Sequence, residues 1–184
     1  MLTDPTTAMT RATIDSFAAD LPMQDRQDFD DATRGFVGRS TERQVVSDDG
    51  RVVWGLDAYE FMRGAQTPDS ANPSLWRQGQ LLIEDGLFEV APGIYQLRGF
   101  DLSVMSVIEG ETGVIVIDPL ISTETAAAAF ALYSEHRGDR PVKAMIYTHS
   151  HVDHFGGVKG IITDEQVAAG EVEVIAPEGL MHHA

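Results

Sequence analysis

The spacing of hydrophobic residues changes near residue 86. Before that point large apolar side chains are sparse or recur at helical spacing, as Phe29, Ala32 and Phe36 do. After it, short runs of β-branched and aromatic residues follow one another between turn residues, which is typical of strands. We therefore predict an N-terminal extension over residues 1–86 and a β-rich domain over residues 87–184.

The N-terminal extension is expected to contain an arm, helices and a hairpin. Residues 1–20 are mostly small and polar, so we predict a loose arm there. Proline, glycine and capping residues place the remaining elements. These are a helix from Pro22 to Gly35, a hairpin over residues 44–54, a short helix over residues 57–64 and a helix from Pro73 to Gly86.

Strands dominate the second part. The strand over residues 114–117 is apolar on both faces, which is typical of a strand in a covered sheet. The order of elements predicts an α/β fold with a β-α-β unit that carries functional residues at the carboxyl end of a strand. The predicted elements are strands over residues 93–99, 102–108 and 114–117, a helix from Ser122 or Thr123 to Gly138, a strand over residues 142–147, short helices over residues 157–162 and 164–169, and a strand over residues 172–175.

Four potential metal ligands follow the strand over residues 142–147. They are His149, His151, Asp153 and His154. In an extended segment alternate side chains share a face, so the first three would project together and His154 would point away. A turn is therefore expected after Asp153. Gly156 and Gly157 can take a positive φ or let the backbone approach closely, which would bring His154 to a second metal centre.

The ligand types favour zinc or a similar divalent ion. Imidazoles and a carboxylate, in a chain without cysteine, suit such ions better than a thiolate site would. Two ions about 3.5–4 Å apart can activate a water molecule, so we predict a hydrolase with two Zn²⁺ per complete site. Two alternatives stay open. The histidines are isolated polar residues at a strand end, or they form one closed structural zinc site.

Asp118 ends the apolar strand over residues 114–117, where its carboxylate needs a polar partner. A histidine of the metal site is one candidate partner, and Asp118 would then orient that ligand. The alternative is that Asp118 caps the turn that begins at Pro119. The sequence alone does not favour either role.

Composition argues against some partners. The 184 residues carry a formal net charge of −16 and a pI near 4.5, so nucleic acids and anionic membranes would be repelled. The apolar fraction of 43% is ordinary for a globular protein. No apolar run is long enough to span a bilayer, and the first residues lack the apolar core of a secretory signal. We therefore expect no nucleic-acid partner, no membrane span and a cytoplasmic location.

The segment over residues 148–157 resembles the metal-binding motif of the metallo-β-lactamase superfamily. Other segments are similar to the N-terminal part of the alkylsulfatases, which hydrolyse dodecyl sulfate and related esters. These segments cover residues 72–78, 86–90, 94–103, 139–142 and 176–179. The similarity extends from about Asp25 to the end of the chain.

This resemblance implies the first half of an αββα sandwich, with a two-metal site and an N-terminal helical and hairpin extension. It implies that His149 and His151 hold the first zinc ion. Asp153 and His154 would hold the second and are the candidate catalytic residues. The implied protein is a homodimer that hydrolyses an alkyl sulfate ester to an alcohol and sulfate.

Two other functions stay open. The same fold carries other hydrolases, such as thioesterases and lactonases, and a non-catalytic metal-binding fragment is the remaining hypothesis. The sequence ends at Ala184, and the four ligands do not complete two metal sites. We therefore expect this chain to need further C-terminal residues for tight metal binding and catalysis.

Overall fold

The computed structural model describes residues 6–184, and the contacts of the chain form two compact units. One unit comprises the chain up to Thr33 together with Ala58–Glu84, and the other comprises Arg34–Asp57 and Asp85–Ala184. The predicted domain division at residue 86 stays a prediction. Within this chain, residues 34–57, which include the hairpin, make their contacts with the β-rich unit.

The first unit is helical, and it corrects the expectation of a loose arm. Residues 8–19 form a helix because the Thr7 hydroxyl accepts a hydrogen bond from the Thr10 amide at 3.1 Å and alanines favour helix. The part of the predicted arm over residues 1–5 lies outside the described residues. The elements are α1 (Ala8–Ala19), α2 (Gln27–Thr33), the 3₁₀ turn η1 (Glu60–Met62) and α3 (Pro73–Leu82).

The second helix is shorter than predicted, because it begins at Gln27 and not at Pro22. Phe36, which continues the helical spacing of Phe29 and Ala32 in the sequence, instead begins a strand and packs edge-on against Phe88 with ring centroids 5.4 Å apart. The helix after the loop starts where the sequence predicted, but it ends at Leu82 and not at Gly86, which begins a strand. Asn72 accepts hydrogen bonds from the first turn of α3, and Pro73 occupies its first position.

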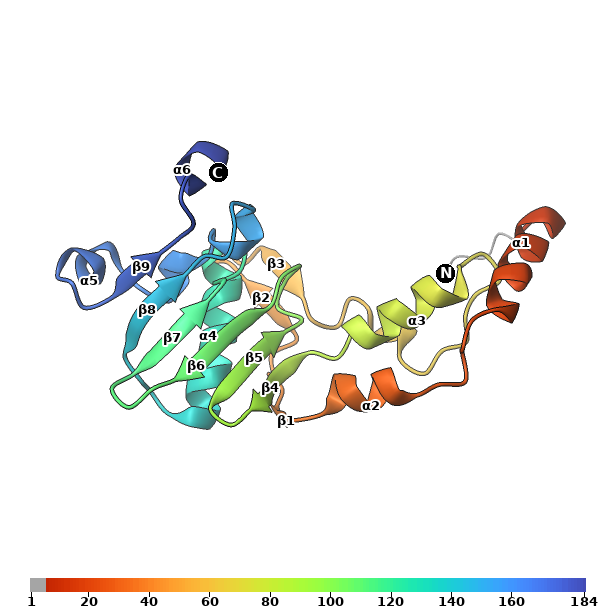
Figure 1. Ribbon diagram of the computed structural model, residues 1–184, viewed down its shortest axis with the longest axis horizontal. Coiled ribbons are helices and arrows are strands. Elements are labelled where there is room, and N and C mark those ends of the chain that lie inside the picture. Colours follow the sequence, from red (N-terminus) through yellow and green to blue (C-terminus); the bar gives the residue numbers. More distant parts are fainter. Residues whose placement is uncertain (1–5) are drawn as a thin grey trace. The chain divides into compact units, whose positions relative to one another are not determined.

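A seven-stranded sheet forms the body of the second unit, in the order β1-β4-β5-β6-β7-β8-β9 (Figure 1). Strands β1 to β7 of this sheet pair antiparallel, and β7, β8 and β9 pair parallel. The predicted hairpin forms a separate two-stranded sheet. The strands are β1 (Phe36–Gly38), β2 (Gln44–Val46), β3 (Val52–Gly55), β4 (Gly86–Ala91), β5 (Ile94–Arg98), β6 (Met105–Glu109), β7 (Val114–Ile117), β8 (Val142–Ile146) and β9 (Glu173–Ile175).

Helix α4 (Thr123–Arg137) covers one face of this sheet and completes the predicted β-α-β unit (Figure 1). Ser122 caps it and Gly138 follows its end, as the sequence predicted. Buried hydrophobic side chains from the helix and the sheet form the core between them. This core includes Leu97, Val107, Val116, Met145, Ala129 and Tyr133. The α/β fold class is therefore confirmed.

The parallel pairing of β7 with β8 places the ends of these two strands together. Ile117 lies opposite Ile146, and the Asp118 amide donates a hydrogen bond to the Ile146 carbonyl at 2.9 Å. The residues that follow each strand therefore meet at one edge of the sheet, which is where α/β proteins commonly carry their sites.

Short elements complete the second unit. The helix predicted over residues 157–162 is only a 3₁₀ turn. Among residues 6–184, no helix is both long and apolar enough to cross a bilayer. The short elements are η2 (Val152–His154), η3 (Val158–Gly160), α5 (Asp164–Ala168) and α6 (Leu180–His183).

Glu109 joins the end of β6 to the last turn of α4. One of its oxygens accepts hydrogen bonds from the Tyr133 hydroxyl at 2.8 Å and from Arg137 Nε at 3.0 Å, and the other lies 3.3 Å from an Arg140 nitrogen. The hydrogen bonds from Arg137 hold the pKa of Glu109 below its usual range. Because this pKa is lower in the folded chain, the stabilisation is present above the unfolded value of about 4.3 and is lost as pH falls.

Replacing Glu109 with Gln should lower the free energy of unfolding by about 1.5–3 kcal/mol at neutral pH, the usual size for a hydrogen bond to a charged group. Urea unfolding of both proteins at neutral pH and well below pH 4 measures the effect. The difference between them should shrink in acid. An equal difference at both pH values would contradict the assigned role of the charge.

Candidate metal centre

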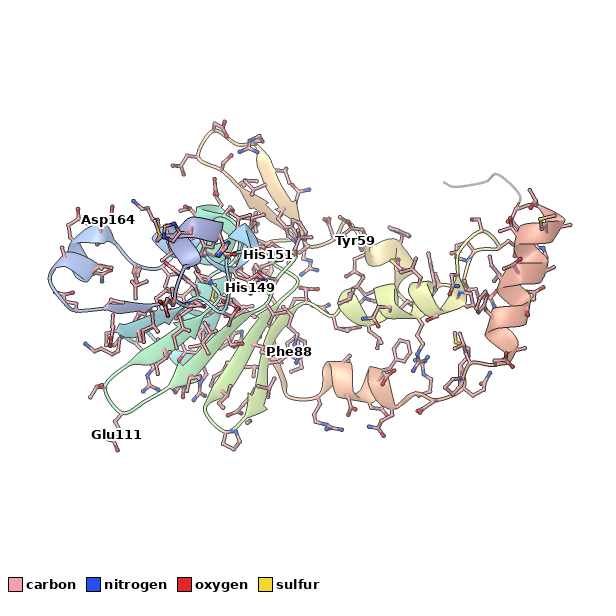
Figure 2. The ribbon with its side chains drawn as sticks, turned by 45° about the horizontal axis from the view of Figure 1, so that its top comes forward. Tyr59, Phe88, Glu111, His149, His151 and Asp164 are labelled. Atoms are coloured by element: carbon pink, nitrogen blue, oxygen red, sulfur yellow. The ribbon has the colours of Figure 1, made fainter. Side chains whose placement is uncertain are left out.

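The segment after β8 bends earlier than the sequence predicted. Strand β8 ends at Ile146, and residues 152–154 form the turn η2, so the chain is not extended as far as Asp153. As a result the ring of His154 lies beside that of His149, with centroids 4.0 Å apart. The rings of His149 and His151 are 4.6 Å apart (Figure 2). The predicted turn is therefore present, but it begins at Val152, before Asp153, and continues through residues 155–157.

Gly156 and Gly157 act through close backbone approach and not through a positive φ. A Cβ atom on Gly157 would lie 2.2 Å from the Pro119 carbonyl oxygen, and one on Gly156 would lie 2.3 Å from the Ile121 carbonyl oxygen. The Gly157 amide also donates a hydrogen bond to the Leu120 carbonyl at 2.8 Å. The glycines therefore let the segment after the histidines lie directly against the connection between β7 and α4.

Asp118 holds the candidate ligands from the end of β7. Its carboxylate, 10% exposed, accepts hydrogen bonds from the Thr148 amide at 2.8 Å, the Thr148 hydroxyl at 2.7 Å and His154 Nδ1 at 2.8 Å. Asp118 itself has φ 55°, a strained backbone conformation for a residue with a side chain. The contact with His154 is the histidine partnership considered for Asp118 from the sequence. Its role beside a bound metal stays a prediction.

These contacts also decide which nitrogens carry protons. Asp118 accepts only, so the Thr148 hydroxyl must donate its single proton to it. The Thr148 oxygen, 2.9 Å from His149 Nδ1, is then left as an acceptor, and that nitrogen must carry a proton. The same argument protonates His154 Nδ1. Both rings thus present Nε2 as the atom available to a metal.

The remaining contact tests whether the residues fit a cation. His154 Nε2 lies 3.3 Å from Asp153 Oδ2, so an imidazole nitrogen and a carboxylate oxygen face each other. The donor types, imidazole and carboxylate, are those preferred by zinc. Among residues 6–184, however, no group of three or more His, Asp or Glu side chains is arranged to hold an ion. The residue types suit part of a metal centre, and two of the four candidate ligands, Asp153 and His154, face each other.

Sequence reasoning missed residues that orient this segment. Thr148 stands next to His149 in the sequence, and its hydroxyl was a visible local signal. Ser103 gave no such signal, because its hydroxyl donates to the main-chain carbonyl of Asp153, which is distant in the sequence. His182 and His183, the other histidines near the end of the sequence, are exposed in α6.

Comparison with known proteins gives a consistent family of matches. The family model described as the metallo-beta-lactamase superfamily matches residues 98–184. An alkyl/aryl-sulfatase of Saccharomyces cerevisiae is 49% identical over 164 residues, which are 89% of this chain and 25% of that protein. A linear primary-alkylsulfatase of Pseudomonas sp. is 47% identical over 181 residues, which are 98% of this chain and 27% of that protein.

A solved structure agrees with these relatives. The stereoselective inverting sec-alkylsulfatase from Pseudomonas sp. superposes with a TM-score of 0.91 at 46% identity. The superposition covers 98% of this chain and 28% of that one. The chain therefore spans about a quarter of the length of the relatives it matches.

Replacing Thr148 with Val should change the tautomer of His149, because Nδ1 loses the oxygen that accepts its proton. In the wild-type chain, ¹⁵N NMR of labelled histidine in metal-free alkaline buffer should show the proton on Nδ1. The Val variant should show a mixture of both tautomers. A Ser variant keeps the hydroxyl and should behave like the wild type, whereas a wild-type His149 protonated on Nε2 would refute the assignment.

Proposed function

This chain belongs to the metallo-β-lactamase superfamily through residues 98–184, and we propose that it supplies part of the active site of a zinc-dependent alkylsulfatase. The family and the partial metallo-β-lactamase-like α/β fold expected from the sequence are confirmed. The proposed reaction is hydrolysis of an alkyl sulfate ester, such as dodecyl sulfate, to an alcohol and sulfate. The whole protein's activity is proposed because the chain spans only about a quarter of its relatives.

The observation that carries the proposal is the similarity over nearly the full chain. Both the yeast and the Pseudomonas relatives are named as sulfatases of alkyl esters, and they are 49% and 47% identical to this chain. The similarity includes the N-terminal extension, since the Pseudomonas match covers 98% of the chain. The candidate metal ligands are neighbours in the structure, which supports the same reading independently.

In this proposal His149 and His151 bind one zinc ion, and Asp153 and His154 bind the second. Bound zinc ions supply Lewis-acid activation of water and stabilise negative charge on the ester. Asp118 keeps the proton of His154 on Nδ1 and so reserves Nε2 for the metal. Because the chain spans about a quarter of its relatives' length, we propose that other residues of the full-length protein complete the coordination.

The negative charge of the chain, −16, does not by itself exclude an anionic substrate. Divalent ions are the largest local charges in a site of this kind and dominate the field that a sulfate group meets. The alkyl tail would pack against apolar side chains. A homodimeric assembly and a cytoplasmic location belong to the proposal as well.

The test uses the full-length protein that contains this chain. Zinc content measured by elemental analysis and sulfate release from dodecyl sulfate should both be present in the wild type. Replacing His149 or Asp153 with Ala should remove zinc and reduce sulfate release by about 100-fold or more. His136, exposed in the last turn of α4, is the matched control, and its replacement with Ala should leave both unchanged.

The outcomes separate the alternatives. Turnover of thioesters or lactones without release of sulfate would overturn the substrate class and favour another hydrolase. Stoichiometric zinc without turnover of any ester would favour a metal-binding module. A wild-type protein that holds no zinc would overturn the metal site itself.

A further inference from the structure

The connection between β5 and β6 reaches the candidate metal centre from a different part of the fold. The Ser103 hydroxyl donates a hydrogen bond to the main-chain carbonyl of Asp153. Ser103 is 6% exposed and the neighbouring Asp101 is 7% exposed, although both are polar. Leu102, which lies between them, is by contrast 76% exposed. The connection thus turns its two polar side chains inward, toward the metal-binding segment.

Asp101 is a buried carboxylate whose bonds join separate segments. It accepts hydrogen bonds from the Ser103 amide at 2.7 Å and from the Ile121 amide at 2.7 Å. It also lies 3.3 Å from the Thr125 hydroxyl, in the first turn of α4. A buried charge requires such partners, and here they come from the β5–β6 connection, the turn after β7 and helix α4.

The turn after β7 is the one that carries Asp118. Asp101 therefore holds that turn through the Ile121 amide and, through Ser103, holds the carbonyl of Asp153. Asp118 in turn binds Nδ1 of His154, the residue after Asp153. The relative position of the Asp153 carboxylate and the His154 ring is consequently set from two sides.

We propose that Asp101 and Ser103 are positioning residues of the metal centre. They fix the main chain at Asp153 relative to Asp118, so that the Asp153 carboxylate and His154 Nε2 face each other at 3.3 Å. This inference rests on the proposed function, since it assigns the pair a role at the second metal. Neither residue touches the metal or the substrate in this proposal, and both act through the main chain of a ligand.

The hydroxyl of Ser103 is the group to remove. Ala at this position deletes the hydrogen bond to Asp153 and also the 3.1 Å contact of the same hydroxyl with Asp101, and it leaves the Asp101 carboxylate its two amide donors. Thr keeps a hydroxyl and serves as the rescue variant. Ser106, half-buried on the neighbouring β6, provides a matched Ser→Ala control in the same region of the fold.

The first measurement needs no metal. The carbonyl ¹³C resonance of Asp153 in the 184-residue chain reports directly on the hydrogen bond that it accepts. It should move on Ser103→Ala, return toward the wild-type position in Ser103→Thr and stay unchanged in Ser106→Ala. An unchanged Asp153 resonance in Ser103→Ala would overturn the proposal.

The second measurement uses the full-length protein and Zn²⁺ titrated against a competing chelator. Ser103→Ala should weaken binding of one zinc ion by about 10- to 100-fold, the usual effect of removing a group that orients a ligand. It should also change the visible absorption of the Co²⁺-substituted protein. Equal weakening in Ser106→Ala, or wild-type affinity and spectrum in Ser103→Ala, would overturn the positioning role. If the wild-type protein binds zinc but releases no sulfate, only the proposed function is overturned.

Discussion

The site depends on one buried carboxylate, that of Asp118. The parallel pairing of β7 with β8 brings this carboxylate next to the residues that follow β8, because both strands end at the same edge of the sheet. There it accepts three hydrogen bonds, two from Thr148 and one from His154. A carboxylate in this position would be costly without such donors, so its charge and the arrangement of the histidines stabilise each other.

The fold around this contact was largely readable from the sequence. The strands over residues 94–98, 114–117 and 142–146 have strong apolar patterns, and the start and end of α4 are marked by Ser122 and Gly138. Helix α1 was missed because it buries no residue and so has no apolar stripe. Its formation depends on local helix propensity and on the Thr7 cap, and both are weak signals in a sequence.

For the candidate site, the sequence predicted the residue types but not their arrangement. Neighbouring histidines and an aspartate identified the segment, but an extended strand was expected as far as Asp153, whereas a 3₁₀ turn already begins at Val152. The contacts of Ser103 with Asp153 and of Asp101 with Ile121 join residues far apart in the chain. Periodicity and spacing do not encode such pairs.

The close approach at Gly157 restricts how this protein can diverge. A Cβ atom there would meet the carbonyl oxygens of Pro119 and Ser122 at 2.5 Å or less, and a Cβ atom on Gly160 would lie 2.2 Å from the carbonyl oxygen of Thr123. Substitutions at these positions would displace the loop that carries the histidines from the start of helix α4. Natural and laboratory variants that retain the fold should accordingly differ at solvent-facing positions such as Val152, while Gly157 and Gly160 stay glycine.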